Sequence, residues 1–252
     1  MAGIWESQNK VIPGAYINIL TNTPLSITAG DRGTVVLAQE LSVGTDNEIY
    51  EITVNNAAYP DNATAADKKL AGLALLGAKT VLLYKLPASH TDEHVEAMLT
   101  ALKTVDFDVL VYPYAKSGTG SSTAQQTIAT WIKSIQDDEG KNVTVVLPNY
   151  TADSEYVINS VQGVTLSDGS NLTAYETAAW IGGITAGASV TKSNTGQKFV
   201  GAIDVSPRMT RSEQETAIKA GKFLLDVDRS QNVTVVADIN SLTTTNQTKS
   251  DI

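Results

Sequence analysis

Two histidines lie four residues apart in residues 90–94, which read His-Thr-Asp-Glu-His. One group of zinc peptidases uses this H-x-x-E-H pattern, with both imidazoles on one helix face. A helix is expected to begin here, capped by Ser89 or Thr91, which would leave both histidines on its exposed first turn. Asp92 and Glu93 are typical of such a start because they complement the helix dipole. The chain has no other histidine. The sequence therefore favours a helix start, and we predict no metal site.

A second candidate is the loop at residues 114–123, Tyr-Ala-Lys-Ser-Gly-Thr-Gly-Ser-Ser-Thr. It follows an apolar strand and precedes a helix, the position at which parallel sheets usually bind ligands. Backbone N–H groups and hydroxyls at Gly118, Gly120, Ser121 and Ser122 could hold an anion or a nucleotide phosphate. Short loops of Gly, Ser and Thr are also ordinary turn and helix-cap sequences, so both interpretations stay open.

Residues 72–80 resemble a phosphate-binding P-loop but fail its requirements. Lys79 stands one position late, and the segment joins a helix to a strand, whereas a P-loop joins a strand to a helix. Its glycines, Gly72 and Gly77, are expected to end the helix.

The composition excludes several further classes of chemistry and binding partner. The 252 residues include no Cys, which excludes disulfides, thiolate catalysis and Cys-bound zinc. A net charge of −9 argues against general binding to nucleic acid or anionic membranes, which needs clustered Lys and Arg. The amino terminus lacks the apolar region of a signal peptide. The longest apolar stretch, residues 70–78, is too short to span a bilayer. We find no G-x-S-x-G elbow either, so we predict a protein that is not an enzyme and needs no cofactor.

The elements that must position these residues alternate between strands and helices. Apolar strands at residues 80–86, 107–112 and 143–147 indicate a sheet buried on both faces. This pattern predicts an α/β fold with a layered, mostly parallel sheet and helices on both faces. The other expected strands are residues 34–41, 48–54, 157–161, 164–166 and 199–205, with 222–227 and 233–239 as a hairpin. The expected helices are residues 64–77, 91–104, 122–138, 173–187 and 210–221, three of them opened by Thr-x-x-Asp or Thr-x-x-Glu capping boxes.

The helix at residues 173–187 has an unusually small inner face, made of Ala178, Ala179, Gly182, Gly183 and Ala186. Glycine inside a helix costs about 1 kcal/mol relative to alanine. We therefore expect another element to approach this helix closely.

Residues 1–33 are expected to form an extended arm and linker. Within residues 11–20, Ile17 and Ile19 alternate with Tyr16, Asn18 and Leu20 in the manner of a strand that begins at Pro13 and Gly14. Proline restricts such a strand to an edge position or a strand start. A lone terminal strand either frays or pairs with a sheet edge.

Six segments in order resemble the tail sheath proteins of contractile bacteriophage tails and phage-tail-like bacteriocins. No single segment is diagnostic, but together they cover nearly the whole chain. They are Val-Ile-Pro-Gly-Ala-Tyr-Ile-Asn at 11–18, Asp-Arg-Gly-Thr-Val-Val at 31–36, residues 131–141, residues 173–187, Ala-Gly-Lys-Phe-Leu-Leu at 220–225, and residues 238–245.

The resemblance implies a domain organisation with two departures from many family members. Residues 1–33 would be the N-terminal arm and linker, 34–205 the sheath core domain, and 206–252 the incomplete start of a C-terminal α+β domain. Many sheath proteins insert a β-sandwich between the strands that match residues 79–86 and 107–113, where this chain has only a helix. The family also continues past residue 252, so the chain is expected to be a C-terminally truncated piece.

The function implied by the resemblance is that of a structural subunit in a virion tail or phage-tail-like particle, assembled in the host cytoplasm. Such subunits polymerise helically around a tail tube and, after baseplate triggering, contract to drive the tube through a cell envelope. The implied partners are neighbouring sheath subunits, the tube protein and the baseplate, with no nucleic acid and no membrane. By analogy, residues 21–30 are the linker and the assembly arm contains Val11, Pro13, Gly14, Tyr16, Ile17 and Ile19. The alternative is an α/β anion- or nucleotide-binding protein or enzyme that uses the loop at residues 118–123.

Overall fold

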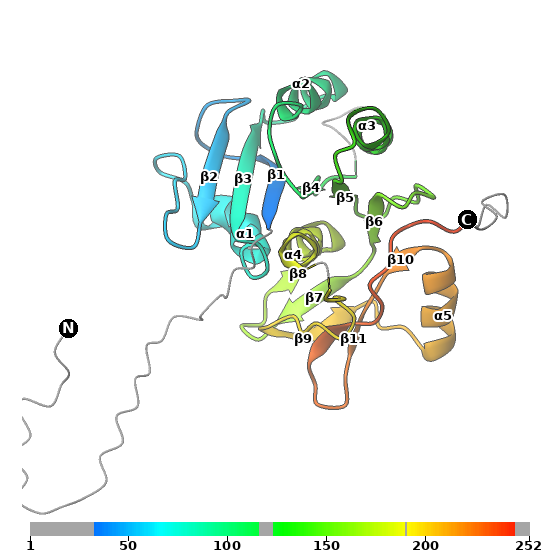
Figure 1. Cartoon of the computed structure of the whole chain (residues 1–252). Coiled ribbons are helices and arrows are strands. Elements are labelled where there is room, and N and C mark those ends of the chain that lie inside the picture. Colours follow the sequence, from blue (N-terminus) through cyan, green and yellow to red (C-terminus); the bar gives the residue numbers. More distant parts are fainter. Residues whose placement is uncertain (1–32, 116–122, 190, 245–252) are drawn as a thin grey trace, which may run out of the picture.

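A computed structural model describes residues 33–115, 123–189 and 191–244 of the chain (Figure 1). The predicted arm residues Val11, Pro13, Gly14, Tyr16, Ile17 and Ile19 lie outside this part of the chain. So do Gly118, Gly120, Ser121 and Ser122 of the predicted anion loop.

In the described part of the chain, a seven-stranded sheet forms the centre, and β2 is its only antiparallel strand. The strands, in spatial order, are β10 (Lys222–Phe223), β6 (Val157–Ser160), β5 (Thr144–Val146), β4 (Val109–Val111), β1 (Thr34–Glu40), β3 (Thr80–Leu86) and β2 (Ile49–Thr53). The central strand β1 has β3 on one side and β4 on the other, with Val35 paired to both Val81 and Val109. Its apolar residues are buried on both faces, as predicted for a covered parallel sheet.

Helices cover both faces of this sheet, which confirms the predicted α/β class (Figure 1). Side chains of β1 alternate, so that Val35 and Leu37 pack in one hydrophobic cluster and Val36 and Ala38 in another. The first cluster includes residues of α1 (Ala65–Ala74) and α4 (Ala174–Gly187). The second includes residues of α2 (Asp92–Leu102) and α3 (Ala124–Glu139).

A second layer lies beyond α4. Its elements are the three-stranded antiparallel sheet β8 (Asn171–Leu172), β7 (Gly163–Leu166) and β9 (Ala202–Ser206), the pair β11 (Leu225–Val227) and β12 (Val233–Val235), and α5 (Arg211–Lys219). Figure 1 shows α4 between the seven-stranded sheet and this smaller sheet, and α4 contacts strands of both. Trp180 of α4 stacks on Phe199 with ring centroids 4.2 Å apart. A helix enclosed by two layers must be apolar all round, which explains its composition.

Small residues let α4 meet α1 backbone to backbone, as its inner face predicts. A Cβ atom built on Gly183 would lie 2.1 Å from the carbonyl oxygen of Ala74, and one on Gly187 would lie 1.9 Å from that of Gly77. Neither approach is possible with a larger residue in place. Gly77 lies past the end of α1 and completes this contact, whereas Gly72 lies inside α1 rather than ending it.

Three helices begin at the predicted residues, and the predicted C-terminal hairpin forms only in part. Thr64, Thr173 and Thr210 are N-caps with complete capping boxes. The expected strand at residues 222–227 is divided in two. β10 adds to the main sheet beside β6, and only β11 pairs with β12. Because β10 contributes to the main sheet, the described residues after 206 contact the body directly. The predicted domain boundary stays a prediction.

Candidate functional site

A buried polar cluster lies at the carboxyl edge of the main sheet. Glu40 ends β1, His90 lies between β3 and α2, and Tyr112 follows β4. Nδ1 of His90 lies 2.7 Å from Oε1 of Glu40, and Nε2 lies 2.7 Å from the Tyr112 hydroxyl. The backbone N–H of His90 also donates to the same Glu40 oxygen at 3.1 Å. Both ring nitrogens of His90 are therefore engaged by groups that come from two different strands.

The predicted exposure of His90 is wrong. Its side chain is 1% exposed, and it precedes α2 rather than lying on its first turn. Ser89, just before it, adopts a positive φ of 56°, and the imidazole lies between the Glu40 carboxylate at the end of β1 and the Tyr112 hydroxyl just after β4. His94 does lie on the first turn, where its Nδ1 accepts the backbone N–H of Thr91 at 3.0 Å and completes a capping box. Thr91 is thus the N-cap of α2, which is one of the two caps predicted, Ser89 or Thr91.

Tyr114, two residues after Tyr112, extends this cluster. Its hydroxyl accepts the backbone N–H of Glu40 at 2.7 Å, and its ring meets that of His90 edge-on at 4.8 Å. Burial, and next the negative charges nearby, raise the pKa of Tyr112 well above its usual value. Burial likewise raises the pKa of Tyr114. Both phenols stay protonated at neutral pH, so the cluster acts as a set of hydrogen bonds that joins β1, β4 and the start of α2.

In the described structure each of the two histidines has a hydrogen-bonding role of its own. Over residues 33–115, 123–189 and 191–244, no group of three or more His, Cys, Asp or Glu side chains is placed to hold a metal ion. The same part of the chain contains no helix that is both long enough and apolar enough to cross a bilayer. The H-x-x-E-H pattern instead supplies one buried hydrogen-bonding residue and one capping residue.

The described end of the predicted anion loop carries a carboxylate. Oδ2 of Asp92 accepts from the backbone N–H of Thr123 at 3.2 Å and lies 3.1 Å from its hydroxyl. Thr123 is the N-cap of α3, where an anion would otherwise be attracted by the helix dipole. A carboxylate at this position opposes a second anion, so the described geometry does not favour phosphate binding there.

The first described residues form a tightly held root for the predicted arm. Oδ2 of Asp108, just before β4, accepts the backbone N–H groups of Gly33 at 3.1 Å and Thr34 at 2.9 Å. The backbone N–H of Asp108 in turn donates to the Thr34 carbonyl at 2.9 Å. On the other side, the Gly33 carbonyl accepts from Lys79 and Thr80 at 2.9 and 3.0 Å. Gly33 and Thr34, at the start of β1, are thus hydrogen-bonded to residues at the starts of both β3 and β4.

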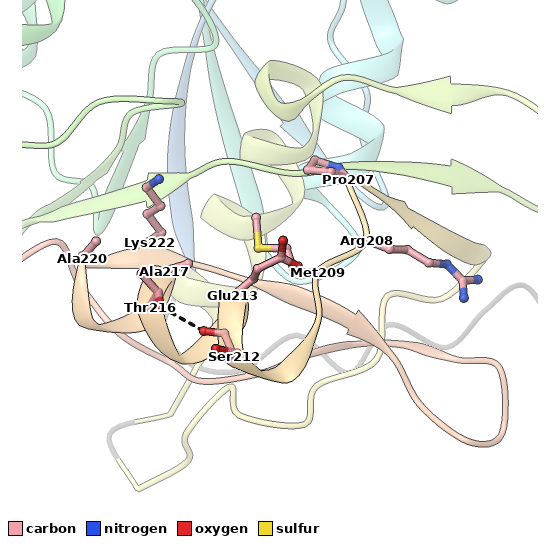
Figure 2. Close-up of a pocket in the computed structure, with 9 residues that line it drawn as sticks. All are labelled: Pro207, Arg208, Met209, Ser212, Glu213, Thr216, Ala217, Ala220 and Lys222. Atoms are coloured by element: carbon pink, nitrogen blue, oxygen red, sulfur yellow. Dashed lines mark hydrogen bonds between the residues drawn. The ribbon is translucent and has the colours of Figure 1, made fainter.

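A shallow hollow of about 400 Å³ lies beside α5 (Figure 2). Its walls come from the turn after β9 and from one face of α5, with Met209 and Ala217 supplying apolar surface. In Figure 2 the Arg208 side chain extends away from the other labelled residues, and its Nε donates to Asp204 at 2.6 Å. This arginine is therefore committed to an ion pair with a residue that does not line the hollow.

Neither Glu40, Tyr112 nor Asp108 stands out in the sequence. Each is a single residue at a strand end, 50, 22 and 75 positions from its respective partner in these contacts. No local spacing signals such pairs, because only the parallel sheet places their strand ends side by side.

The fold and these contacts define an α/β protein in which polar residues at the strand ends form hydrogen bonds between its own strands and helices. The described chain is similar to a solved structure, the sheath tail protein DSY3957 from Desulfitobacterium hafniense. The two share 26% identity and a TM-score of 0.75 over 92% of this chain and 76% of that one.

Sequence comparisons point the same way. Residues 88–241 match the family described as "Phage tail sheath protein central domain", and the chain belongs to this family. It is 30% identical to the tail sheath protein of Clostridium phage phiCD119, over 64% of this chain and 43% of that protein. It is also 30% identical to the Bacillus subtilis (strain 168) protein YqbK over 93% of this chain and 51% of YqbK. The chain thus spans about half the length, or less, of the curated relatives it matches.

Proposed function

We propose that the chain is part of a structural subunit of a contractile tail sheath. In this proposal, subunits polymerise helically around a tail tube in a phage tail or a phage-tail-like particle, and contraction drives the tube through a cell envelope. The observation that supports it is the family match across residues 88–241, together with the sheath-protein fold of the described body. Neighbouring sheath subunits, the tube protein and the baseplate are the proposed partners.

The physical demand on such a subunit is to stay linked to its neighbours while it moves. Open helical arrays require heterologous interfaces, in which two different surfaces of the same molecule meet. An extended segment that adds a strand to a neighbour's sheet supplies such a link through main-chain hydrogen bonds. A linker between that strand and the body then absorbs rotation and sliding.

We assign this role to the first residues of the chain. Residues 11–20, with Val11, Pro13, Gly14, Tyr16, Ile17 and Ile19, would be the exchanged strand, and residues 21–30 would be the linker. The support from the described residues is the root at Gly33, because a segment that links two bodies needs a firm attachment to its own. The acidic net charge of −9 gives no reason to add nucleic acid or an anionic membrane as a partner.

Negative-stain electron microscopy of the full-length sheath protein tests the assignment. Deletion of residues 1–20 is expected to leave the α/β body folded, by circular dichroism, and to abolish hollow striated sleeves. A finer pair of variants uses the alternation of the strand. Ile17→Asp with Ile19→Asp should prevent sleeves, whereas Asn18→Asp, which changes the opposite face, should permit them. Normal sleeves from the deletion variant would refute the arm assignment.

A further inference from the structure

The root of the arm is built from residues that lie far apart in sequence. Asp108 holds the Gly33–Thr34 dipeptide through two carboxylate bonds and one backbone bond, on the β4 side. Lys79 and Thr80 hold the Gly33 carbonyl on the β3 side. Gly33 and Thr34 are therefore hydrogen-bonded on both sides, toward β3 and toward β4, at the start of β1.

Gly33 is required at this point for two reasons. Its φ of +139° is a conformation that residues with a side chain rarely adopt. A Cβ atom there would also lie 3.0 Å from the backbone nitrogen of Lys79 and 3.6 Å from Cα of Gly187. Gly33 therefore lies close to the backbone of Lys79 and Gly187, in a conformation that favours glycine.

The strand that follows is placed to resist tension. β1 lies inside the sheet between β3 and β4, and its register pairs Thr34 with Thr80 and Glu40 with Leu86 along the whole of β3. When parallel strands are pulled in opposite directions along their axes, the ladder bonds share the load and must break together. A force on the arm would act on β1 in this way, against β3 and β4 on its two sides.

We infer that Asp108 and Gly33 form a mechanical anchor that passes tension from the arm into the central sheet. This inference rests on the proposed function, because it assumes that the arm is pulled. Asp108 is a positioning residue here, since its carboxylate holds the root in line with β1 and thereby keeps the load in shear. Without the carboxylate, the first residues of β1 would be pulled away from β4 one bond at a time.

Single-molecule pulling on the 252-residue chain tests the anchor directly. Because the sequence contains no cysteine, Ser7→Cys and Ala88→Cys provide unique handles that load β1 from its amino end against the carboxyl end of β3. Asp108→Ala in this background should raise the unfolding rate at a fixed force by about tenfold or more. The substitution removes two hydrogen bonds to a charged acceptor, the stronger kind of hydrogen bond, and a tenfold change in rate corresponds to about 1.4 kcal/mol.

A second pulling axis separates anchoring from general stability. Handles at Thr100→Cys in α2 and Ser134→Cys in α3 load the molecule without pulling on the root. Asp108→Ala should leave the unfolding rate on this axis within about twofold. Asp106→Ala, which removes a carboxylate two residues earlier, should leave both axes unchanged.

The possible outcomes distinguish a failure of the anchor from a failure of the proposed function. An unchanged rate on the arm axis, or an equal increase on both axes, would overturn the anchor whatever the sleeves do. Normal sleeves after deletion of residues 1–20 would instead refute the arm, and would leave the pulling result as a property of the body alone.

Discussion

The close contact between α4 and α1 predicts that the substitution Gly183→Ala lowers the free energy of unfolding. The added Cβ atom would lie 2.1 Å from the carbonyl oxygen of Ala74, whereas Cβ atoms in proteins essentially never come within 3.0 Å of such an atom. The two backbones must therefore separate by about 1 Å or more. The smaller sheet lies on the far side of α4 and limits this movement.

The expected magnitude follows from two opposing effects. Alanine is favoured over glycine inside a helix by about 1 kcal/mol. Overpacking a core costs about 1–3 kcal/mol and more when backbone atoms collide. We expect the clash to exceed the helical gain, with a net loss of about 2 kcal/mol in the free energy of unfolding. For a chain of this size the melting temperature should fall by about 4–8 °C.

Gly72→Ala is the matched control, because it makes the same substitution inside the neighbouring helix α1. A Cβ atom on Gly72 meets nothing within 4 Å, so only the helical gain applies and the variant should be as stable as the parent or up to about 1 kcal/mol more stable. Urea unfolding followed by circular dichroism measures both variants. If Gly183→Ala matched or exceeded the parent in stability, the close-approach explanation would be refuted.

Three further predictions concern the polar groups. His90→Phe keeps an aromatic ring but leaves Glu40 and Tyr112 without their partner, so the free energy of unfolding should fall by about 2–4 kcal/mol; an unchanged urea midpoint would contradict this role. Burial favours the neutral form of Asp67, but hydrogen bonds from Ser42 and Thr64 outweigh it and lower its pKa. Its stabilisation is therefore complete above the unfolded pKa of about 3.9 and is lost as pH falls through the folded pKa. Asp67→Asn should accordingly be less stable at pH 7 and lose less stability than the parent between about pH 5 and 2, as measured by thermal unfolding across pH. Inorganic phosphate or ATP should leave the melting temperature unchanged, whereas binding at 100 times Kd would add about 2.7 kcal/mol and favour the anion-loop alternative.

Local sequence signals predict the elements well where the chemistry is local. The capping boxes at Thr64, Thr173 and Thr210 start their helices at the expected residue, because each is made within one turn. The apolar strand at residues 80–86 matches β3 in full. The segment at residues 222–227 is less well predicted, since the choice between pairing with β6 and pairing with β12 depends on strands that are distant in sequence.

The polar sites depended on non-local contacts. His90 appears in the sequence beside Asp92 and Glu93 at a helix start, where exposure is the normal outcome. Its burial follows from Glu40 and Tyr112, which reach it only because β1 and β4 are neighbours in the sheet. Asp108 reaches Gly33 for the same reason.

The sequence by itself determined the class of fold, the helix starts and the small face of α4, because periodicity, capping and residue size act within a few positions of the chain. Only the tertiary structure decided which backbone meets Gly183, why His90 is buried, and how Gly33 is held. These contacts join residues tens of positions apart, and the order of strands in a parallel sheet, which brings them together, is set by the packing of the whole core.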